Sequence, residues 1–216
     1  PVETTTTVAD STTTEPPATT ATTEAPTTTT TEPAAAAPTF AELQTASIPA
    51  MCLHPATTLV DGEDTSLAEN EGVFALRDAL PSGEPAHIEG VPSDSGPLTV
   101  VVARCNGGGV SWPDAVLFFS AGAEFYGGTF LSAPTVEDAA PATGSWEGAW
   151  DAVGASGPGR EGVSAIALDR DAVVVTTSVE LPDDGACCPS GEAEVRLVPS
   201  GGQIEVDGIT RTDPGA

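Results

Sequence analysis

The sequence predicts one mainly β domain, an antiparallel sheet or small sandwich-like fold with a short N-terminal helix, preceded by a disordered stalk. Runs of β-branched and aromatic residues recur between turns rich in glycine and proline, which is typical of antiparallel β folds. The first 38 residues are almost all Thr, Ala, Pro and Glu. The chain contains four cysteines and only 5% aromatic residues. A core this poor in aromatic side chains needs covalent support.

Residues 1–38 form the predicted stalk, and no aromatic residue precedes Phe40. The stalk has too little apolar surface to offset the backbone entropy lost on ordering, so we expect a disordered linker. Its prolines favour extended polyproline II, in which a stalk of this length would reach on the order of 100 Å. Tracts rich in Thr and Pro are also frequent sites of O-glycosylation. The stalk therefore indicates a domain held away from a cell surface.

A short helix is expected where the stalk ends. Thr39 is a suitable N-cap, and Glu42 three residues later completes a capping box. Phe40 and Leu43 would form the apolar face of the helix, and Pro49 ends it by residue 48.

The chain beyond this helix has the pattern of β structure. The run 98–104 is nearly all apolar and β-branched, and Gly127-Gly128 predicts a bulge or a turn. The strands expected before residue 132 are 72–77, 98–104, 115–119, 124–126 and 129–131.

Four further strands are expected to form an antiparallel meander. Segment 192–198 alternates polar and apolar residues, as a half-exposed strand should. The predicted strands are 163–168, 173–181, 192–198 and 203–206. The folded domain is expected to span 39–210, with a flexible C-terminal tail at 211–216.

The formal net charge of −26 excludes two classes of partner. Five of the 32 acidic residues lie in the stalk and all six basic residues are arginines beyond it, which leaves about −21 on the rest of the chain. Nucleic acid and anionic membrane surfaces both require a basic face, so neither is an expected partner. No apolar run is long enough to span a membrane. We expect any targeting segment, and any lipid-carrying cysteine, to lie upstream of Pro1.

The densest acidic clusters are 61–64 and 169–171. Solubility explains them best, and neither matches the spacing of a helix–loop–helix calcium site. A calcium-binding surface domain stays open as an alternative. The sequence otherwise indicates no cofactor and no metal.

Two disulfides are expected from the four cysteines Cys52, Cys105, Cys187 and Cys188. Four cysteines allow three pairings, and a bond between the adjacent Cys187 and Cys188 would close a strained ring. We therefore expect Cys52 and Cys105 each to bond one of the adjacent pair, with the assignment open. A zinc site of Cys52, His54, Cys187 and Cys188 is a weaker alternative, because the usual Cys-x-x-Cys spacing is absent. Disulfides persist outside the reducing cytosol, which indicates a secreted or envelope-anchored protein.

Three short segments resemble one family. The segments CNGGGVSWPDAVLFF at 105–119, GAEFYGGT at 122–129 and CCPSG at 187–191 are similar to LppP/LprE-type lipoproteins of actinobacteria. The resemblance covers about residues 50–207. It implies a cell-envelope lipoprotein domain without a settled activity, and it assigns no catalytic residue.

No motif assigns a reaction to this chain. The two histidines, His54 and His87, are not accompanied by a Gly-x-Ser-x-Gly turn, and no phosphate-binding glycine loop is present. The absence of lysine excludes Ser–Lys dyads and Schiff-base chemistry. An exported hydrolase that uses His54 or His87 remains the enzymatic alternative.

The leading hypothesis is a non-enzymatic binding or structural module on a stalk, whose partner is an envelope glycan, a peptide or a secreted protein. Its candidate contact residues are the larger aromatics Trp112, Tyr126, Trp146 and Trp150. Trp146 and Trp150 are also explained as cover for the core, and Trp112 as cover for a disulfide.

Overall fold

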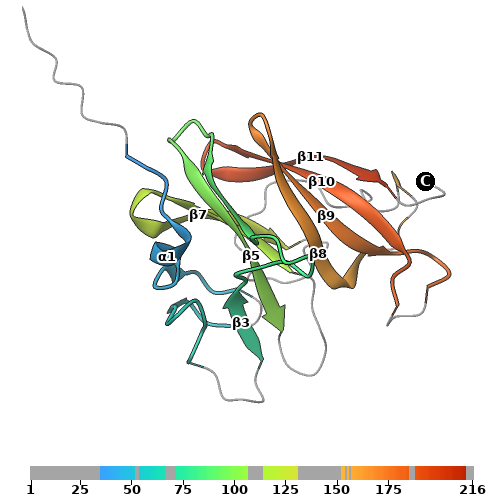
Figure 1. The fold of residues 1–216 in the computed structure, drawn as a ribbon, viewed down its shortest axis with the longest axis horizontal. Helices are drawn as coiled ribbons and strands as arrows, with labels where there is room; N and C mark the ends of the chain where they lie inside the picture. Colours follow the sequence, from blue (N-terminus) through green and yellow to red (C-terminus); the bar gives the residue numbers. More distant parts are fainter. Residues whose placement is uncertain are drawn as a thin grey trace, which may run out of the picture. The chain divides into compact units, whose positions relative to one another are not determined.

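The computed structural model describes residues 35–51, 54–66, 72–106, 114–130, 152–153, 155, 157–184 and 188–212. In this part of the chain eleven strands form three antiparallel sheets, and one short α-helix precedes the first strand (Figure 1). The prediction of a mainly β fold with a short N-terminal helix is confirmed. No helix in the described ranges has the length and hydropathy needed to cross a membrane. The elements are α1 (Phe40–Leu43), β1 (Ser47–Ile48), β2 (Thr57–Thr58), β3 (Val73–Leu76), β4 (His87–Val91), β5 (Leu98–Asn106), β6 (Ala115–Ser120), η1 (Ala121–Ala123), β7 (Glu124–Phe130), β8 (Gly157–Asp169), β9 (Ala172–Glu180), β10 (Gly191–Ser200) and β11 (Gln203–Arg211).

The five-stranded sheet is buried on both faces, which explains the continuous apolar run in its central strand. Its order is β3-β5-β6-β7, and β4 also pairs with β5. Alternate residues of β5 enter two different cores: Leu98, Val100 and Val102 point to one side, and Val101, Ala103 and Cys105 to the other. A strand covered on both faces loses the polar–apolar alternation of a half-exposed strand.

The first of these cores lies between the five-stranded sheet and the meander. We call it the inter-sheet core; it contains buried residues of β4–β6 and β8–β11, among them Val100, Phe118, Val175 and Leu197. The meander has the order β11-β10-β9-β8, as the alternating pattern of β10 predicted. Arg170 (φ 62°) lies in the tight turn between β8 and β9. The two sheets therefore pack as a small sandwich.

The second core, which we call the N-terminal core, covers the opposite face of the five-stranded sheet. It contains Leu43, Ile48, Leu59, Phe74, Val101, Leu117 and Phe119, among others. The predicted capping box is present, because the Thr39 amide donates to Glu42 Oε2 (2.7 Å) and the Glu42 amide donates to Thr39 Oγ1 (3.4 Å). Two hydrogen bonds attach the segment before α1 to the five-stranded sheet. The buried Thr99 hydroxyl donates to the carbonyl of Pro38, and the Phe40 amide donates to Glu89 Oε1 (3.0 Å).

One strand was not predicted, and one local expectation was met in part. His87 lies in strand β4, in a segment where no strand was expected. Residues 124–130 form one strand, so no turn interrupts it at Gly127-Gly128. The alternative of a bulge is confirmed, because the register with β6 shifts between Phe118, which pairs with Gly127, and Phe119, which pairs with Phe125. The glycines permit close packing instead: a Cβ on Gly128 would lie 2.7 Å from Leu117 Cδ2.

Candidate functional site

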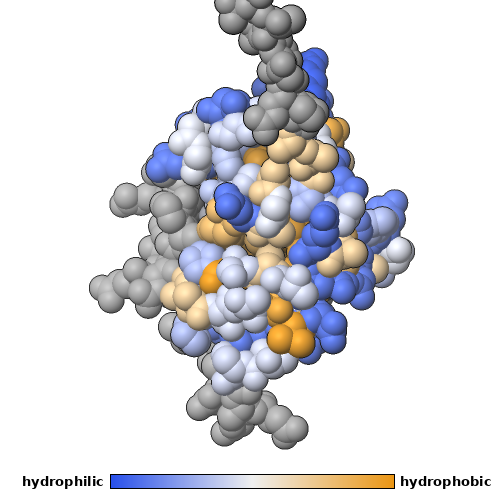
Figure 2. All heavy atoms as spheres, turned by 90° about the vertical axis from the view of Figure 1, so that its left-hand side faces the viewer, coloured by the Kyte–Doolittle hydropathy of each residue, from blue (hydrophilic) through white to orange (hydrophobic). Residues whose placement is uncertain are grey.

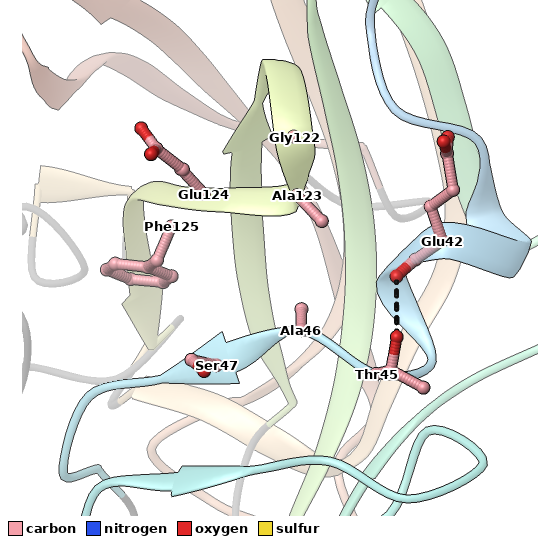
Figure 3. Close-up of a pocket in the computed structure, with 8 residues that line it drawn as sticks. All are labelled: Glu42, Thr45, Ala46, Ser47, Gly122, Ala123, Glu124 and Phe125. Carbon is pink, nitrogen blue, oxygen red and sulfur yellow. Dashed lines mark hydrogen bonds between the residues drawn. The ribbon is translucent and has the colours of Figure 1, made fainter.

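A groove of about 560 Å³ opens between the N-terminal layer and the beginning of β7. Figure 3 shows the side chains of Ala46 and Ala123 directed toward each other across it, with Glu42 and Glu124 at its two sides. We call it the β7 groove. Its described lining residues are Glu42, Thr45, Ala46, Ser47, Gly122, Ala123, Glu124 and Phe125.

Two backbone features form the groove. Gly122 (φ 76°) and Ala123 (φ 57°) both adopt left-handed conformations, and this lets the chain turn through η1 into β7. A positive φ at an alanine is uncommon and carries a small strain. On the other side, the Thr45 hydroxyl donates to the Glu42 carbonyl (3.5 Å) and closes the last turn of α1 (Figure 3). Both walls are thus set by local turns, and small residues between them leave the space open.

The β7 groove is acidic. The hydrogen bonds from the Thr39 backbone amide and hydroxyl lower the pKa of the Glu42 carboxyl, because they stabilise its charged form. Glu124 is exposed to solvent. No arginine belongs to the described lining, so nothing in that lining neutralises the two carboxylates.

The face that carries α1 has an apolar middle. Figure 2 shows apolar side chains gathered along the centre of this face, with hydrophilic side chains beside them. Phe125 contributes a half-buried ring to the groove, and a T-shaped contact with Phe119 holds that ring in place (centroids 5.8 Å apart). The groove therefore combines apolar contact area with two negative charges.

The aromatic residues predicted to contact a ligand are only partly placed by the structure. The Tyr126 hydroxyl accepts from the Gly202 amide (3.0 Å) and lies 3.4 Å from Asp94 Oδ1. Asp94 Oδ2 accepts from the Gly201 amide (3.0 Å), so this group holds the turn between β10 and β11. Trp112, Trp146 and Trp150 lie outside the described residues, and their role as contacts stays a prediction.

His54 is buried in a polar clamp. Its Nδ1 lies 3.2 Å from Asp64 Oδ2, and its Nε2 lies 3.3 Å from the Asn106 carbonyl oxygen. Both partner atoms are oxygens, so each ring nitrogen faces a hydrogen-bond acceptor. Both ring nitrogens are therefore engaged, which disfavours the zinc alternative. In the described ranges, no group of three or more His, Cys, Asp or Glu residues is placed to hold a metal ion.

His87 packs flat against Phe40, with ring centroids 4.5 Å apart and an interplanar angle of 10°. Its Nδ1 is buried and has no hydrogen-bond partner among the described residues. Within that same part of the chain, no serine hydroxyl hydrogen-bonds either imidazole. The described residues thus do not assemble the Ser–His–carboxylate arrangement that a hydrolase would need.

One arginine contacts three carboxylates at the second acidic cluster. Arg196 Nη1 lies 2.6 Å from Asp169 Oδ2, Arg196 Nε lies 3.1 Å from Asp207 Oδ2, and Asp171 lies 3.9 Å from Nη2. The hydrogen bond from Arg196 lowers the pKa of the Asp169 carboxyl. An arginine among these acids disfavours the calcium alternative at this cluster.

Two of the four cysteines, Cys105 and Cys188, lie in the described ranges. Cys105 is disulfide-bonded and buried in the N-terminal core. Cys188 is exposed. Cys52 and Cys187 lie outside the described residues, so the expected pairing stays a prediction.

We expect Asp64 to make the domain sensitive to acid. Its side chain is 0% exposed, and although burial raises the pKa of its carboxyl, the hydrogen bonds from Ser66 and His54 outweigh burial and lower it. A lowered folded-state pKa stabilises the fold above the unfolded value, and that contribution disappears as the pH falls through the folded value. Asp64→Asn should therefore reduce the free energy of unfolding at pH 7 by about 1–3 kcal/mol and flatten its decline below about pH 4. Urea titrations at several pH values measure both effects.

Asp171→Asn is the matched control for this prediction, because the Asp171 side chain is 73% exposed. It should change the free energy of unfolding by no more than about 0.5 kcal/mol. An Asp64→Asn variant as acid-sensitive as the original chain would contradict the prediction.

Comparison with known proteins yields no match to a family model, to a curated protein or to a solved structure.

Proposed function

We propose that this chain is a binding domain that works outside the cytoplasm, carried on its N-terminal stalk, and that the β7 groove is its binding surface. The single observation that carries the proposal is the groove itself, an open space of about 560 Å³ that joins apolar contacts to uncompensated charge. The extracytoplasmic location rests on the composition of the stalk, on the cysteines and on the resemblance to LppP/LprE-type lipoproteins.

The anchoring of the chain at the end of the stalk supports this proposal. The segment from Pro38 to Phe40 is hydrogen-bonded to Thr99 and Glu89, and α1 follows it at once to form one wall of the groove. This wall of the groove is therefore fixed to the five-stranded sheet, as a preorganised binding surface requires.

We also propose that Cys52 is the partner of Cys105. Met51 and His54 form an antiparallel bridge, with hydrogen bonds of 3.0 and 2.7 Å between their backbones. The His54 ring in turn contacts the carbonyl of Asn106, the residue next to Cys105. Met51 and His54 flank the segment 52–53, and His54 ties this bridge to the residue next to Cys105. This pairing differs from the one expected from the sequence, which joined each of these cysteines to the adjacent pair.

Photo-crosslinking in the cells that produce the protein tests the binding proposal. With p-benzoylphenylalanine in place of Glu124, irradiation should give a discrete adduct of higher mass, because this side chain lines the groove. The same replacement at Glu194, which is exposed on β10, is the matched control and should give no such adduct. The absence of an adduct from position 124, or equal adducts from both positions, would contradict the proposal.

A further inference from the structure

We propose that the β7 groove binds an extended peptide segment through an arginine or lysine side chain. This inference rests on the proposed function and specifies the ligand class. It follows from three properties of the groove: its apolar lining, its charge and the strands that flank it.

The lining suits the stem of a long basic side chain. Ala46 and Ala123 present only methyl groups to the space between them, and Phe125 adds the edge or face of a ring (Figure 3). Arginine and lysine bury their methylene stems along apolar surface while the charged end stays in contact with water. A ring positioned near a cation adds a further attraction. A short acidic or hydroxylated side chain would leave this lining unfilled.

The charge at the sides of the groove selects a cation. Glu42 and Glu124 lie at opposite sides, and the hydrogen bonds that lower the pKa of the Glu42 carboxyl keep it ionised. The chain has only six basic residues against 32 acidic ones. Among the six basic residues, Arg77 and Arg196 already bind aspartates elsewhere in the fold. An anionic ligand would meet repulsion here, whereas a basic one is attracted by both carboxylates.

The flanking strands favour an extended segment. In the described part of the chain β7 is the last strand of its sheet and pairs only with β6, and β1 pairs only with β2. Their first residues, Ser47 and Glu124, both line the groove. Edge strands present backbone donors and acceptors that an extended peptide can use. In this arrangement the basic side chain of the peptide determines specificity, and hydrogen bonds to the peptide backbone fix the orientation of the peptide.

Nuclear magnetic resonance titration with a small peptide tests the inference on the full chain. The probe is acetyl-Gly-Ala-Arg-Ala-Gly-amide, and its analogue with citrulline in place of arginine keeps the shape but removes the charge. The arginine peptide should shift the backbone amide signals of residues 45–47 and 122–125. The citrulline peptide should bind about tenfold more weakly, because it lacks the charge that the two carboxylates attract.

Protein variants locate the charge effect. Glu124→Gln should weaken binding of the arginine peptide by about threefold to fivefold, the loss expected for one exposed ion pair. Glu194→Gln removes a charge of the same kind from β10 and should leave binding unchanged. Sodium chloride at 0.5 M should weaken binding of the arginine peptide and leave binding of the citrulline peptide unchanged, since salt screens exposed charges.

The outcomes separate this inference from the proposed function. Equal binding of the two peptides, shifts spread over the acidic surface, or equal effects of Glu124→Gln and Glu194→Gln would overturn the inference. If position 124 still forms its crosslinked adduct in that case, the groove binds a partner of another chemistry and the proposed function stands. Loss of both the adduct and the peptide shifts would overturn both.

Discussion

Asp114→Ala should reduce the free energy of unfolding by about 3 kcal/mol, the lower end of the range for breaking a buried ion pair. Asp114 is 2% exposed, at the beginning of β6. Its Oδ1 accepts from Arg77 Nε (3.2 Å) and Nη2 (2.8 Å), and its Oδ2 accepts from the Val163 amide (2.9 Å). One carboxylate thus joins the five-stranded sheet to β8. Its removal leaves the buried Val163 amide without an acceptor and Arg77 without its partner.

The lower end of the range applies because the Arg77 side chain is 25% exposed in the folded protein, so water can solvate its guanidinium once Asp114 is removed. Burial raises the pKa of the Asp114 carboxyl, even though Val163 and Arg77 both favour its charged form. The charged carboxylate therefore carries a desolvation cost, and this too limits the net loss on its removal. Asp114→Asn should also destabilise the fold, because an amide offers one acceptor oxygen, whereas the carboxylate accepts from three N–H groups through both of its oxygens.

Gly162→Ala provides a second route to the same contact. Gly162 has φ 77°, and a Cβ at this position would lie 2.3 Å from Asp114 Oδ2. The substitution should therefore destabilise the fold without removing any polar group. Urea unfolding followed by circular dichroism measures each variant. Asp207→Ala is the surface control and should stay within about 0.5 kcal/mol of the original chain. A change of less than about 1 kcal/mol for Asp114→Ala would contradict the role assigned to this carboxylate.

Local patterns were enough to predict most of the elements. The capping box of Thr39 and Glu42 predicted where α1 begins, and both of its hydrogen bonds are present. The alternation along β10 predicted a half-exposed strand, and its buried and exposed residues alternate as expected. Both signals involve neighbours that lie within a few residues of one another, so they do not depend on the rest of the fold.

Strand β4 was not predicted from the sequence, because its local pattern is irregular. It contains Gly90, which has φ 80°, and its register with β5 shifts between Glu89 and Val91. A bulge of this kind breaks the two-residue period on which strand prediction depends. The strand exists because β5 offers a partner edge, and that edge is not encoded in segment 87–91 itself.

The candidate site depends on contacts that no local pattern contains. The β7 groove joins residues 42–47 to residues 122–125, and small residues with weak individual preferences form both walls. The sequence pointed instead to large aromatics, and the Tyr126 hydroxyl binds the turn at Gly202. His54 likewise drew attention as a catalytic candidate, but its partners Asp64 and Asn106 make it part of a buried clamp. Residue type alone did not distinguish these roles, because the tertiary partners decide them.

Loss of the Cys105 disulfide should reduce the free energy of unfolding by about 4 kcal/mol if Cys52 is its partner. A bond that closes the loop 52–105 restricts the unfolded chain, and the chain-entropy relation gives about 4 kcal/mol for a loop of this length. The bond also lies in the N-terminal core, where Cys105 is 2% exposed. That core supports α1 and hence one wall of the β7 groove, so the reduced protein should also lose peptide-induced shifts at residues 45–47.

A double-mutant cycle tests the pairing of Cys52 with Cys105. If Cys52 and Cys105 are bonded, then Cys52→Ser, Cys105→Ser and the double variant should be destabilised about equally, with a non-additivity of about 4 kcal/mol. Additive effects would show that the two residues act independently and would contradict the pairing. Digestion of the alkylated, unreduced protein gives a direct check. A peptide pair that links Cys52 to Cys105 is the expected product, and a pair that links Cys105 to Cys187 would restore the long-range arrangement expected from the sequence.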